Sequence, residues 1–334
     1  MITPIETPWE PDIWRSELQQ AIRTSTQLLQ YVKVQSDFAS DSEPFPVRVP
    51  RGFADRMVPG DKNDPLLRQV LATTHEQLDT PGFVRDPLEE DNSSNLIHPA
   101  PGLLQKYHGR ALLISTGACA INCRYCFRRH FPYSEHQQSR HEKALAALQR
   151  DDSIEEIILS GGDPLLLDDR ALARLVDSLA QIPHLQRLRI HTRIPVVLPS
   201  RITQALVEML AASRLDVVVV IHSNHAQELD AATARSLAAL HNAGIHLLNQ
   251  AVLLKGVNDN LPAQIALAKA LFSQRVLPYY LHLPDKVAGT AHFFVNDQDA
   301  QTLHHSMQAH LPGYLVAKLV REQAGELSKT IVSI

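Results

Sequence analysis

The sequence is short of cysteine, of aromatic residues and of long apolar runs. Only three of its 334 residues are cysteines, and Phe, Trp and Tyr together make up 5%. A small, odd number of thiols excludes the disulfide framework of a small secreted domain. No apolar run approaches the roughly 18 residues of a membrane span, and the first residues lack the basic start and apolar stretch of a signal peptide. We therefore expect a cytoplasmic protein with reduced thiols and no membrane contact.

Positive charge is not in excess either. The 32 Lys and Arg residues face 36 Asp and Glu residues, which gives a formal net charge of −4. Without a basic surface, nucleic acid is not expected as a substrate. A chain of this length can bury a full hydrophobic core without metal or disulfide support. The sequence therefore indicates one large domain, or one domain with a substantial appendage.

The three cysteines are concentrated in one place. Cys119, Cys123 and Cys126 fall within eight residues, in a C-x3-C-x2-C spacing that can surround a single ion or cluster. An iron–sulfur cluster of the [4Fe–4S] type usually takes four protein thiolates, so three would leave one iron open to another ligand. The alternatives to an iron–sulfur cluster are three inert buried thiols, or a zinc site completed by a nearby histidine such as His130.

The remaining pattern predicts an α/β fold. From residue 105 onwards, short apolar runs alternate with helical stretches of ten or more residues, which favours βαβ units and a parallel sheet. The expected strands cover residues 111–115, 154–160, 188–192, 217–222, 245–253, 276–283 and 315–320. The expected helices between them cover residues 141–150, 168–181, 201–213, 226–242, 262–273 and 297–310. Residues 1–104 are expected to form a helical and irregular cap with little chemistry of its own, including helices over 14–34 and 65–74.

Polar residues fall near the C-terminal ends of the expected strands, where barrels of parallel strands place their active sites. The cysteine loop follows the first strand, and the glycines in Gly161-Gly162-Asp163 after the second permit a close backbone approach to a ligand. Further along the chain, the same position is taken by His222, Gln250 and Asp285. The sequence thus predicts an active site at the mouth of a barrel that also contains the cysteines.

The cysteine spacing resembles the signature of the radical S-adenosylmethionine (radical SAM) enzymes. That resemblance implies a (β/α)6 partial TIM barrel in which the open iron of a [4Fe–4S] cluster binds S-adenosylmethionine. One electron, from a donor such as a flavodoxin-type reductant, then cleaves this cofactor to a 5′-deoxyadenosyl radical. The resemblance also implies which residues surround S-adenosylmethionine: Gly161, Gly162, Asp163, His222 and Gln250.

Longer stretches of the chain are similar to lysine 2,3-aminomutase, among them residues 119–133, 192–199 and 249–259. The chain most resembles the short branch of that family, because it lacks the C-terminal extension and additional cysteines of the metabolic enzymes. This implies conversion of L-lysine to β-lysine, in the R form, for modification of translation elongation factor P by its ligase. The sequence also permits a homo-oligomer.

The same resemblance implies a second cofactor, pyridoxal 5′-phosphate (PLP), and the residues that contact it. Lys329 aligns with the lysine that holds PLP, although the glycine run that precedes it in the metabolic enzymes is reduced to Gly325. Arg110 matches an arginine that binds the phosphate, and Tyr107 an aromatic residue beside it. His282 stands where the metabolic enzymes have a tyrosine in contact with PLP.

Three further residues are implied to bind the substrate. Arg128 matches the arginine that grips the substrate carboxylate, and Asp285 with Glu322 matches two acidic residues that hold the distal ammonium of lysine. Holding both ends keeps the β-carbon near the radical, and a pair of buried carboxylates rejects amino acids without a terminal cation. Two alternatives stay open: a radical 2,3-aminomutase for another amino acid such as arginine or glutamate, and a non-enzymatic iron–sulfur or zinc protein. The carboxylate pair argues against glutamate.

Overall fold

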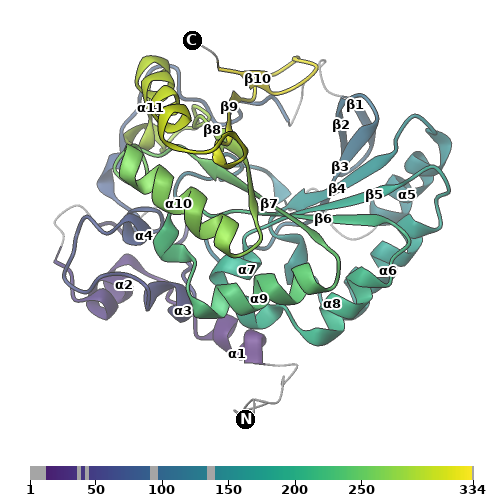
Figure 1. Ribbon diagram of the computed structural model, residues 1–334, viewed down its shortest axis with the longest axis horizontal. Helices are drawn as coiled ribbons and strands as arrows, with labels where there is room; N and C mark the ends of the chain where they lie inside the picture. The colour runs from purple at the N-terminus through teal and green to yellow at the C-terminus, as the bar shows by residue number, and fades with distance from the viewer. Residues whose placement is uncertain (1–12, 36–38, 42–44, 91–96, 134–139, 333–334) are drawn as a thin grey trace.

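The computed structural model describes residues 13–35, 39–41, 45–90, 97–133 and 140–332, and one ten-stranded sheet runs through its centre (Figure 1). Runs rich in Val, Ile and Leu, which favour extended backbone, build most of this sheet. Its seven parallel strands are β3 Arg110–Thr116, β4 Glu156–Gly161, β5 Arg187–Thr192, β6 Asp216–Ile221, β7 His246–Val252, β8 Leu277–His282 and β9 Lys318–Arg321. These strands agree with the seven expected from the sequence to within a few residues at each end.

Helices connect the parallel strands, and Figure 1 shows several of them following one another along one side of the sheet. They are α5 Arg140–Arg150, α6 Asp169–Ala180, α8 Gln204–Ala211, α9 Ala231–Asn242, α10 Leu261–Ser273 and α11 Asp297–His310. Five begin at a capping side chain that accepts a backbone N–H of the first turn, namely Asp168, Thr203, Asp230, Asn260 and Asn296. Each cap satisfies a backbone N–H that has no partner within its helix and so fixes where the helix begins.

The predicted (β/α)6 partial barrel is confirmed. Six βα units run from β3 to α11 and deliver the chain to β9, and the strands keep sequence order across the sheet. The two edge strands are β1 and β10, and no pairing among the described strands joins them. The barrel therefore stays open on one side. No helix in the described part of the chain is both long enough and apolar enough to cross a membrane.

Several predicted elements are shorter than expected. The single helix expected over residues 14–34 is two helices, α1 Ile13–Gln19 and α2 Ser25–Val32, because Thr24 caps a new start. The helix expected over 65–74 ends early, and the helices expected at 201 and 226 begin later, each after a separate short turn. The remaining short elements are α3 Arg51–Ala54, α4 Pro65–Arg68, η1 Thr74–Gln77, η3 Pro164–Leu166, α7 Ile194–Val197, η4 Pro199–Arg201, η5 Ala226–Glu228, η6 Ala291–Phe293 and η7 Gly313–Leu315.

Three antiparallel strands were not predicted. β1 Ile97–Ala100 and β2 Leu103–Tyr107 form a hairpin that pairs with β3, and β10 Thr330–Ile331 pairs with β9. The hairpin turns at Gly102, whose φ of +78° is a conformation that glycine adopts without strain. The sheet therefore begins before residue 105, and one hydrophobic core includes residues from both sides of that point. A separate cap over residues 1–104 stays a prediction.

The N-terminal part of the chain contacts the cysteine loop through charged side chains. Glu76 and Arg124 are a fully buried pair, with Nε of Arg124 2.8 Å from Oε1 of Glu76. Arg129, three residues after the last cysteine, donates to the other oxygen of Glu76 at 2.6 Å. In addition, Nη1 of Arg48 donates to the carbonyl of Cys119 at 2.9 Å. Two charged residues of the loop region are thus fixed by one distant carboxylate.

Glu76→Gln should lower the free energy of unfolding by about 3 to 5 kcal/mol, because it leaves two buried guanidinium groups without a counter-charge. Urea unfolding followed by circular dichroism measures this change. The matched control is Glu155→Gln, which removes the exposed partner of Arg187 at 3.0 Å and should change stability by less than about 1 kcal/mol. Equal effects of the two substitutions would show that Glu76 does not hold the loop.

Candidate active site

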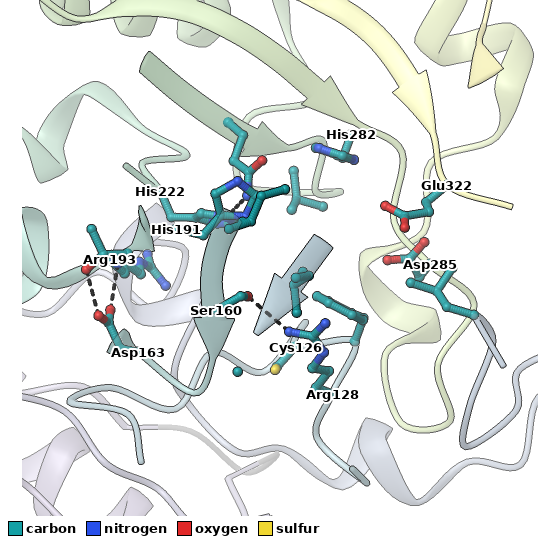
Figure 2. Close-up of a pocket in the computed structure, with 18 of the residues that line it drawn as sticks. Cys126, Arg128, Ser160, Asp163, His191, Arg193, His222, His282, Asp285 and Glu322 are labelled. Atoms are coloured by element: carbon teal, nitrogen blue, oxygen red, sulfur yellow. Dashed lines mark hydrogen bonds between the residues drawn. The ribbon is translucent and has the colours of Figure 1, made fainter. Parts of the chain in front are cut away.

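A cavity of about 310 Å³ lies among the C-terminal ends of the parallel strands and the cysteine loop (Figure 2). The structure brings together in its lining every site residue named from the sequence: Tyr107, Arg110, Cys119, Cys123, Cys126, Arg128, Gly161, Gly162, Asp163, His222, Gln250, His282, Asp285, Glu322 and Lys329. These residues come from segments more than 200 positions apart in the chain. Their individual roles stay predictions, but one cavity contains them all.

The two glycines after β4 let the chain pass close to the cysteine loop. A Cβ on Gly162 would lie 2.3 Å from the carbonyl oxygen of Ala118, a separation that no side chain tolerates. The backbone N–H groups of Gly162 and Asp163 donate to the carbonyls of Thr116 and Ala118, each at 2.7 Å. The close backbone approach expected from these glycines is therefore made to the segment that carries the first cysteine.

The three cysteines line the same cavity, as ligands of one shared cluster must. Burial raises the pKa of Cys126 to about 11 and the pKa of Cys119 well above its usual value, so these thiols ionise when a bound cation compensates the charge. His130, the histidine suggested as a fourth zinc ligand, is engaged elsewhere, because its Nε2 bonds to the carbonyl of Ala288 at 3.1 Å and His130 does not line the cavity.

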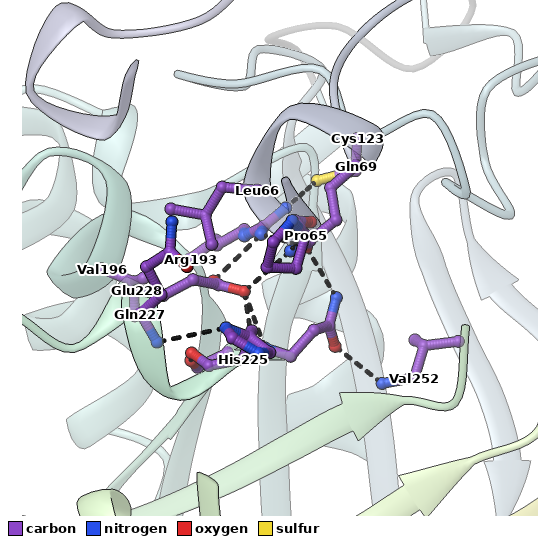
Figure 3. Close-up of polar contacts among 12 residues, drawn as sticks. Pro65, Leu66, Gln69, Cys123, Arg193, Val196, His225, Gln227, Glu228 and Val252 are labelled. Carbon is purple, nitrogen blue, oxygen red and sulfur yellow. Dashed lines mark hydrogen bonds and ion pairs between the residues drawn. The ribbon is translucent and has the colours of Figure 1, made fainter. Parts of the chain in front are cut away.

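One cysteine sulfur accepts a hydrogen bond from Arg193, a residue not named among the site residues predicted from the sequence. Nη1 of Arg193 donates to Sγ of Cys123 at 2.7 Å, while Nη2 contacts Gln69 at 2.7 Å and Glu228 at 3.1 Å (Figure 3). Glu228 is a fully buried carboxylate, and Gln69 donates to its other oxygen at 3.0 Å. Hydrogen bonds to ligand sulfur are among the factors that set the reduction potential of an iron–sulfur cluster.

Asp163 ties the ends of two neighbouring strands together. Its carboxylate accepts the hydroxyl of Thr192 and the backbone N–H of Arg193, both at 2.7 Å (Figure 2). Burial raises the pKa of Asp163 to about 6, which these hydrogen bonds oppose. The carboxylate therefore orients the residue that contacts Cys123, whatever ligand it also binds.

A row of side chains with alternating charge lines the cavity. It consists of Arg128, Glu90, Lys106, Glu322 and Lys329. The Lys106 ammonium lies 3.1 Å from Oε1 of Glu90 and 2.9 Å from Oε1 of Glu322. The Lys329 ammonium pairs with the second oxygen of Glu322. Neither Glu90 nor Lys106 was named from the sequence.

Glu90 and Ser160 hold Arg128, and one N–H on each terminal nitrogen, together called its free edge, has no partner among the described residues. Nε and Nη2 donate to the two oxygens of Glu90 at 2.7 and 3.0 Å, and Nη1 donates to Oγ of Ser160 at 3.1 Å. A guanidinium has five N–H bonds, so one remains on each terminal nitrogen, an arrangement that matches a carboxylate. Burial opposes the charge of Arg128, but Glu90 outweighs it and raises the pKa above its ordinary value.

Two carboxylates lie in the cavity away from this arginine. Figure 2 shows Asp285 and Glu322 close together on the side opposite His191 and His222. Burial and the nearby charge of Glu322 raise the pKa of Asp285 to about 7. Burial also opposes the charge of Glu322, yet Lys329 and Lys106 outweigh it and hold the pKa of Glu322 below its usual range. A further cation entering here would favour the ionised form of Asp285.

The cavity also contains an arginine nitrogen without a partner. The guanidinium of Arg110 lies over the ring of Tyr107, 4.9 Å from its centroid, which places together two residues expected to be neighbours. Nε of Arg110 is buried and makes no hydrogen bond to the described residues. His282 is half-buried in the same lining; desolvation of its ring and then Lys329 hold the pKa of His282 well below its usual value, so its ring is neutral. An anion beside Arg110 would satisfy the unpaired nitrogen.

Sequence reasoning missed several lining residues for different reasons. His191 lies near the end of β5, where the rule applied to the other strands would have found it. Lys106 follows the pattern of an exposed strand lysine, and Glu90 lies in an acidic segment that is typical of a surface turn. Nothing local indicates that either charge is buried, because the partners of both are distant in the sequence.

Asp285→Asn should change how the stability of the ligand-free protein depends on pH. The pKa of Asp285 is about 7 in the folded protein against an ordinary value of 3.8 for aspartate, so its contribution to stability is complete below about pH 3.8 and is lost as the pH rises through 7. Asparagine does not titrate. Between about pH 5 and 8, the wild type should therefore lose on the order of a few kcal/mol relative to the variant. Urea midpoints at a series of pH values measure the difference, and parallel curves would contradict it.

Comparison with known proteins agrees with this site. Residues 113–266 match the family described as the Radical SAM superfamily. The L-lysine 2,3-aminomutase of Escherichia coli (strain K12) is 46% identical, over 98% of this chain and 96% of that protein. The enzyme of the same name from Haemophilus influenzae is 44% identical, over 97% and 98%, and that of Clostridium subterminale is 33% identical, over 96% of this chain but 77% of that protein. The chain belongs to the lysine 2,3-aminomutase family of radical SAM isomerases, among its shorter members.

Proposed function

We propose that the protein converts L-lysine to β-lysine by moving an amino group between adjacent carbons, with a [4Fe–4S] cluster, S-adenosylmethionine and PLP as cofactors. The observation that carries this proposal is the content of one cavity. It combines three thiols, a lysine amine, an arginine with a free edge and a pair of carboxylates. The names of the most similar relatives, at 46% and 44% identity, support lysine as the substrate.

Cys119, Cys123 and Cys126 are the proposed ligands of the cluster, and Arg193 donates to one of their sulfurs. Together, the bound cluster and S-adenosylmethionine supply a radical that removes hydrogen from a carbon without an acidic proton. The residues proposed to contact S-adenosylmethionine are Gly161, Gly162, Asp163, His222 and Gln250. His222 contacts Gln250 through its Nε2 at 2.5 Å, and burial lowers the pKa of His222 to about 3, so the pair is uncharged.

PLP fits the opposite part of the cavity. Lys329 is the amine proposed to hold it, and its ammonium lies 5.8 Å from the ring centroid of Tyr280. The unpaired Nε of Arg110 is suited to a phosphate oxygen, with Tyr107 stacked beside it. His282 provides a neutral ring in the same lining. When bound, PLP carries the amino group during its migration.

The two ends of the cavity select the substrate. The free edge of Arg128 fits the carboxylate of an amino acid, and Glu90 and Ser160 keep that edge in a fixed orientation. Asp285 and Glu322 fit the terminal ammonium of lysine. Glutamate would place a third carboxylate beside these two, which is unfavourable in a buried site. The protein thus positions the substrate, because holding its carboxylate and its terminal ammonium keeps the reacting carbon in one location.

The identities of the relatives lead us to place the enzyme in the elongation factor P pathway. The chain is 46% and 44% identical to the Escherichia coli and Haemophilus influenzae enzymes but 33% identical to the Clostridium subterminale enzyme. We therefore propose that the product is (R)-β-lysine and that a dedicated ligase attaches it to translation elongation factor P. A flavodoxin-type donor would supply the electron. Three reduced cysteines in one site suit a cytoplasmic location for this chemistry.

The proposal is tested by anaerobic incubation of cluster-replete protein with L-lysine, PLP, S-adenosylmethionine and reductant. Chiral chromatography should then detect (R)-β-lysine. In parallel incubations, L-glutamate should give no β-amino acid because it lacks a terminal cation, and L-arginine should give none because its guanidinium is larger than an ammonium group. Absence of β-lysine from protein that contains its cluster and PLP would refute the proposed function. Product from arginine alone would move the assignment to a related aminomutase.

Lys329→Ala and Cys123→Ala should separate the two cofactors. The first removes the amine proposed to hold PLP, so the visible absorption of lysine-bound PLP should disappear while iron and sulfide content stays at the wild-type value. The second should lose the cluster and keep that absorption. Both variants should lose more than 99% of β-lysine formation. Lys318→Ala, at an exposed position of β9, is the matched control and should retain both spectra. Lysine-bound PLP in Lys329→Ala would contradict the assignment.

A further inference from the structure

His191 is a half-buried side chain that lines the cavity, and the proposed function supplies no role for it. It lies in β5 and contributes to the lining of the cavity. Its Nε2 is buried and has no hydrogen-bond partner among the described residues. Buried polar atoms in folded proteins are nearly always paired, with protein, water or ligand. An unpaired nitrogen inside a cavity therefore indicates a contact with a ligand.

The position of His191 relates it to Arg128. Leu159 in β4 pairs with Ile190 in β5, so Ser160 and His191 are the next residues of two adjacent strands. Both line the cavity, and Ser160 accepts Nη1 of Arg128 at 3.1 Å. Figure 2 shows Ser160 between His191 and Arg128. A group bound to the free edge of Arg128 would thus lie on the side of the cavity from which His191 projects.

The charge state of His191 suits a hydrogen bond rather than an ion pair. Burial lowers its pKa well below the usual value, and the positive charges of Arg189, Lys329 and Arg128 act in the same direction, as does His222. A neutral imidazole carries one N–H donor. It can donate to an anion without adding a charge that would repel Arg128.

We propose that Nε2–H of His191 donates a hydrogen bond to the carboxylate of the substrate, beside the free edge of Arg128. The inference rests on the proposed function, because it requires an amino acid whose carboxylate lies against Arg128. A carboxylate offers about four lone-pair sites. The two N–H groups of Arg128 occupy two of them, and His191 takes a third. This contact makes His191 a substrate-binding residue that discriminates the acid from a neutral derivative.

The test compares L-lysine with L-lysinamide, in which a neutral amide replaces the carboxylate. Isothermal titration calorimetry measures the Kd of each for protein that contains its cluster and PLP but no S-adenosylmethionine or reductant, so no turnover occurs. His191→Leu removes the donor, and His191→Gln keeps a neutral N–H. His191→Met is an unbranched replacement without a donor. His246→Leu, at an exposed position of β7, is the matched control.

For L-lysine, His191→Leu and His191→Met should each raise Kd by about tenfold or more, which is the effect of losing a hydrogen bond to a charged group. For L-lysinamide, Kd should change less than threefold. His191→Gln should recover most of the affinity for L-lysine, and His246→Leu should match the wild type. PLP absorption should be the same in every variant.

Equal weakening of both ligands would overturn the inference, because a structural role or a contact with PLP does not discriminate acid from amide. Unchanged affinity for L-lysine in His191→Met would overturn it as well. If His191→Leu does not fold, the comparison of His191→Met with His191→Gln decides the question. A wild-type protein that does not bind L-lysine would instead refute the proposed function, so the two failures are distinguishable.

Discussion

The site depends on a buried carboxylate, Glu76, that holds two arginines of the cysteine region at once. Cys119, Cys123 and Cys126 lie in a segment without regular helix or strand, so no backbone ladder fixes their positions. Arg124 sits between two of them, and Arg129 follows the last. Because charges in a low-dielectric interior must be paired, a displaced loop would leave an uncompensated ion. The charge of Glu76 thereby restricts where the three thiols of the cysteine loop can lie.

The architecture and most of the lining of the cavity could be predicted because their signals are local. The cysteine spacing, the glycines after β4 and the apolar strands are each contained in a few consecutive residues. Capping residues such as Asn296 indicate helix starts in the same way. Residues as distant as Arg128 and Lys329 were assigned to one site by the resemblance to a known family. No local pattern in the sequence predicts that they lie close together.

What could not be predicted depends on contacts between distant segments. Glu90 follows the pattern of a surface acid, yet it is buried because Arg128 and Lys106 surround it. The hairpin of β1 and β2 has little apolar alternation of its own, and it forms a strand pair because β3 offers an edge. The break between α1 and α2 is a smaller failure, since Thr24 is a recognisable cap inside a helical pattern. Contacts with distant segments determine the burial of Glu90 and the pairing of the hairpin, and no short stretch of sequence contains both partners of such a contact.

Glu322 is paired with two ammonium groups of the protein itself, those of Lys106 and Lys329. One carboxylate proposed for the ammonium of the substrate therefore has intramolecular partners. A free lysine molecule arriving before PLP would have to displace an intramolecular partner whose effective concentration is far higher. If Lys329 holds PLP as proposed, its nitrogen leaves Glu322 when the cofactor binds. The amine of Lys329 would then compete with the ammonium of the substrate only before PLP is bound.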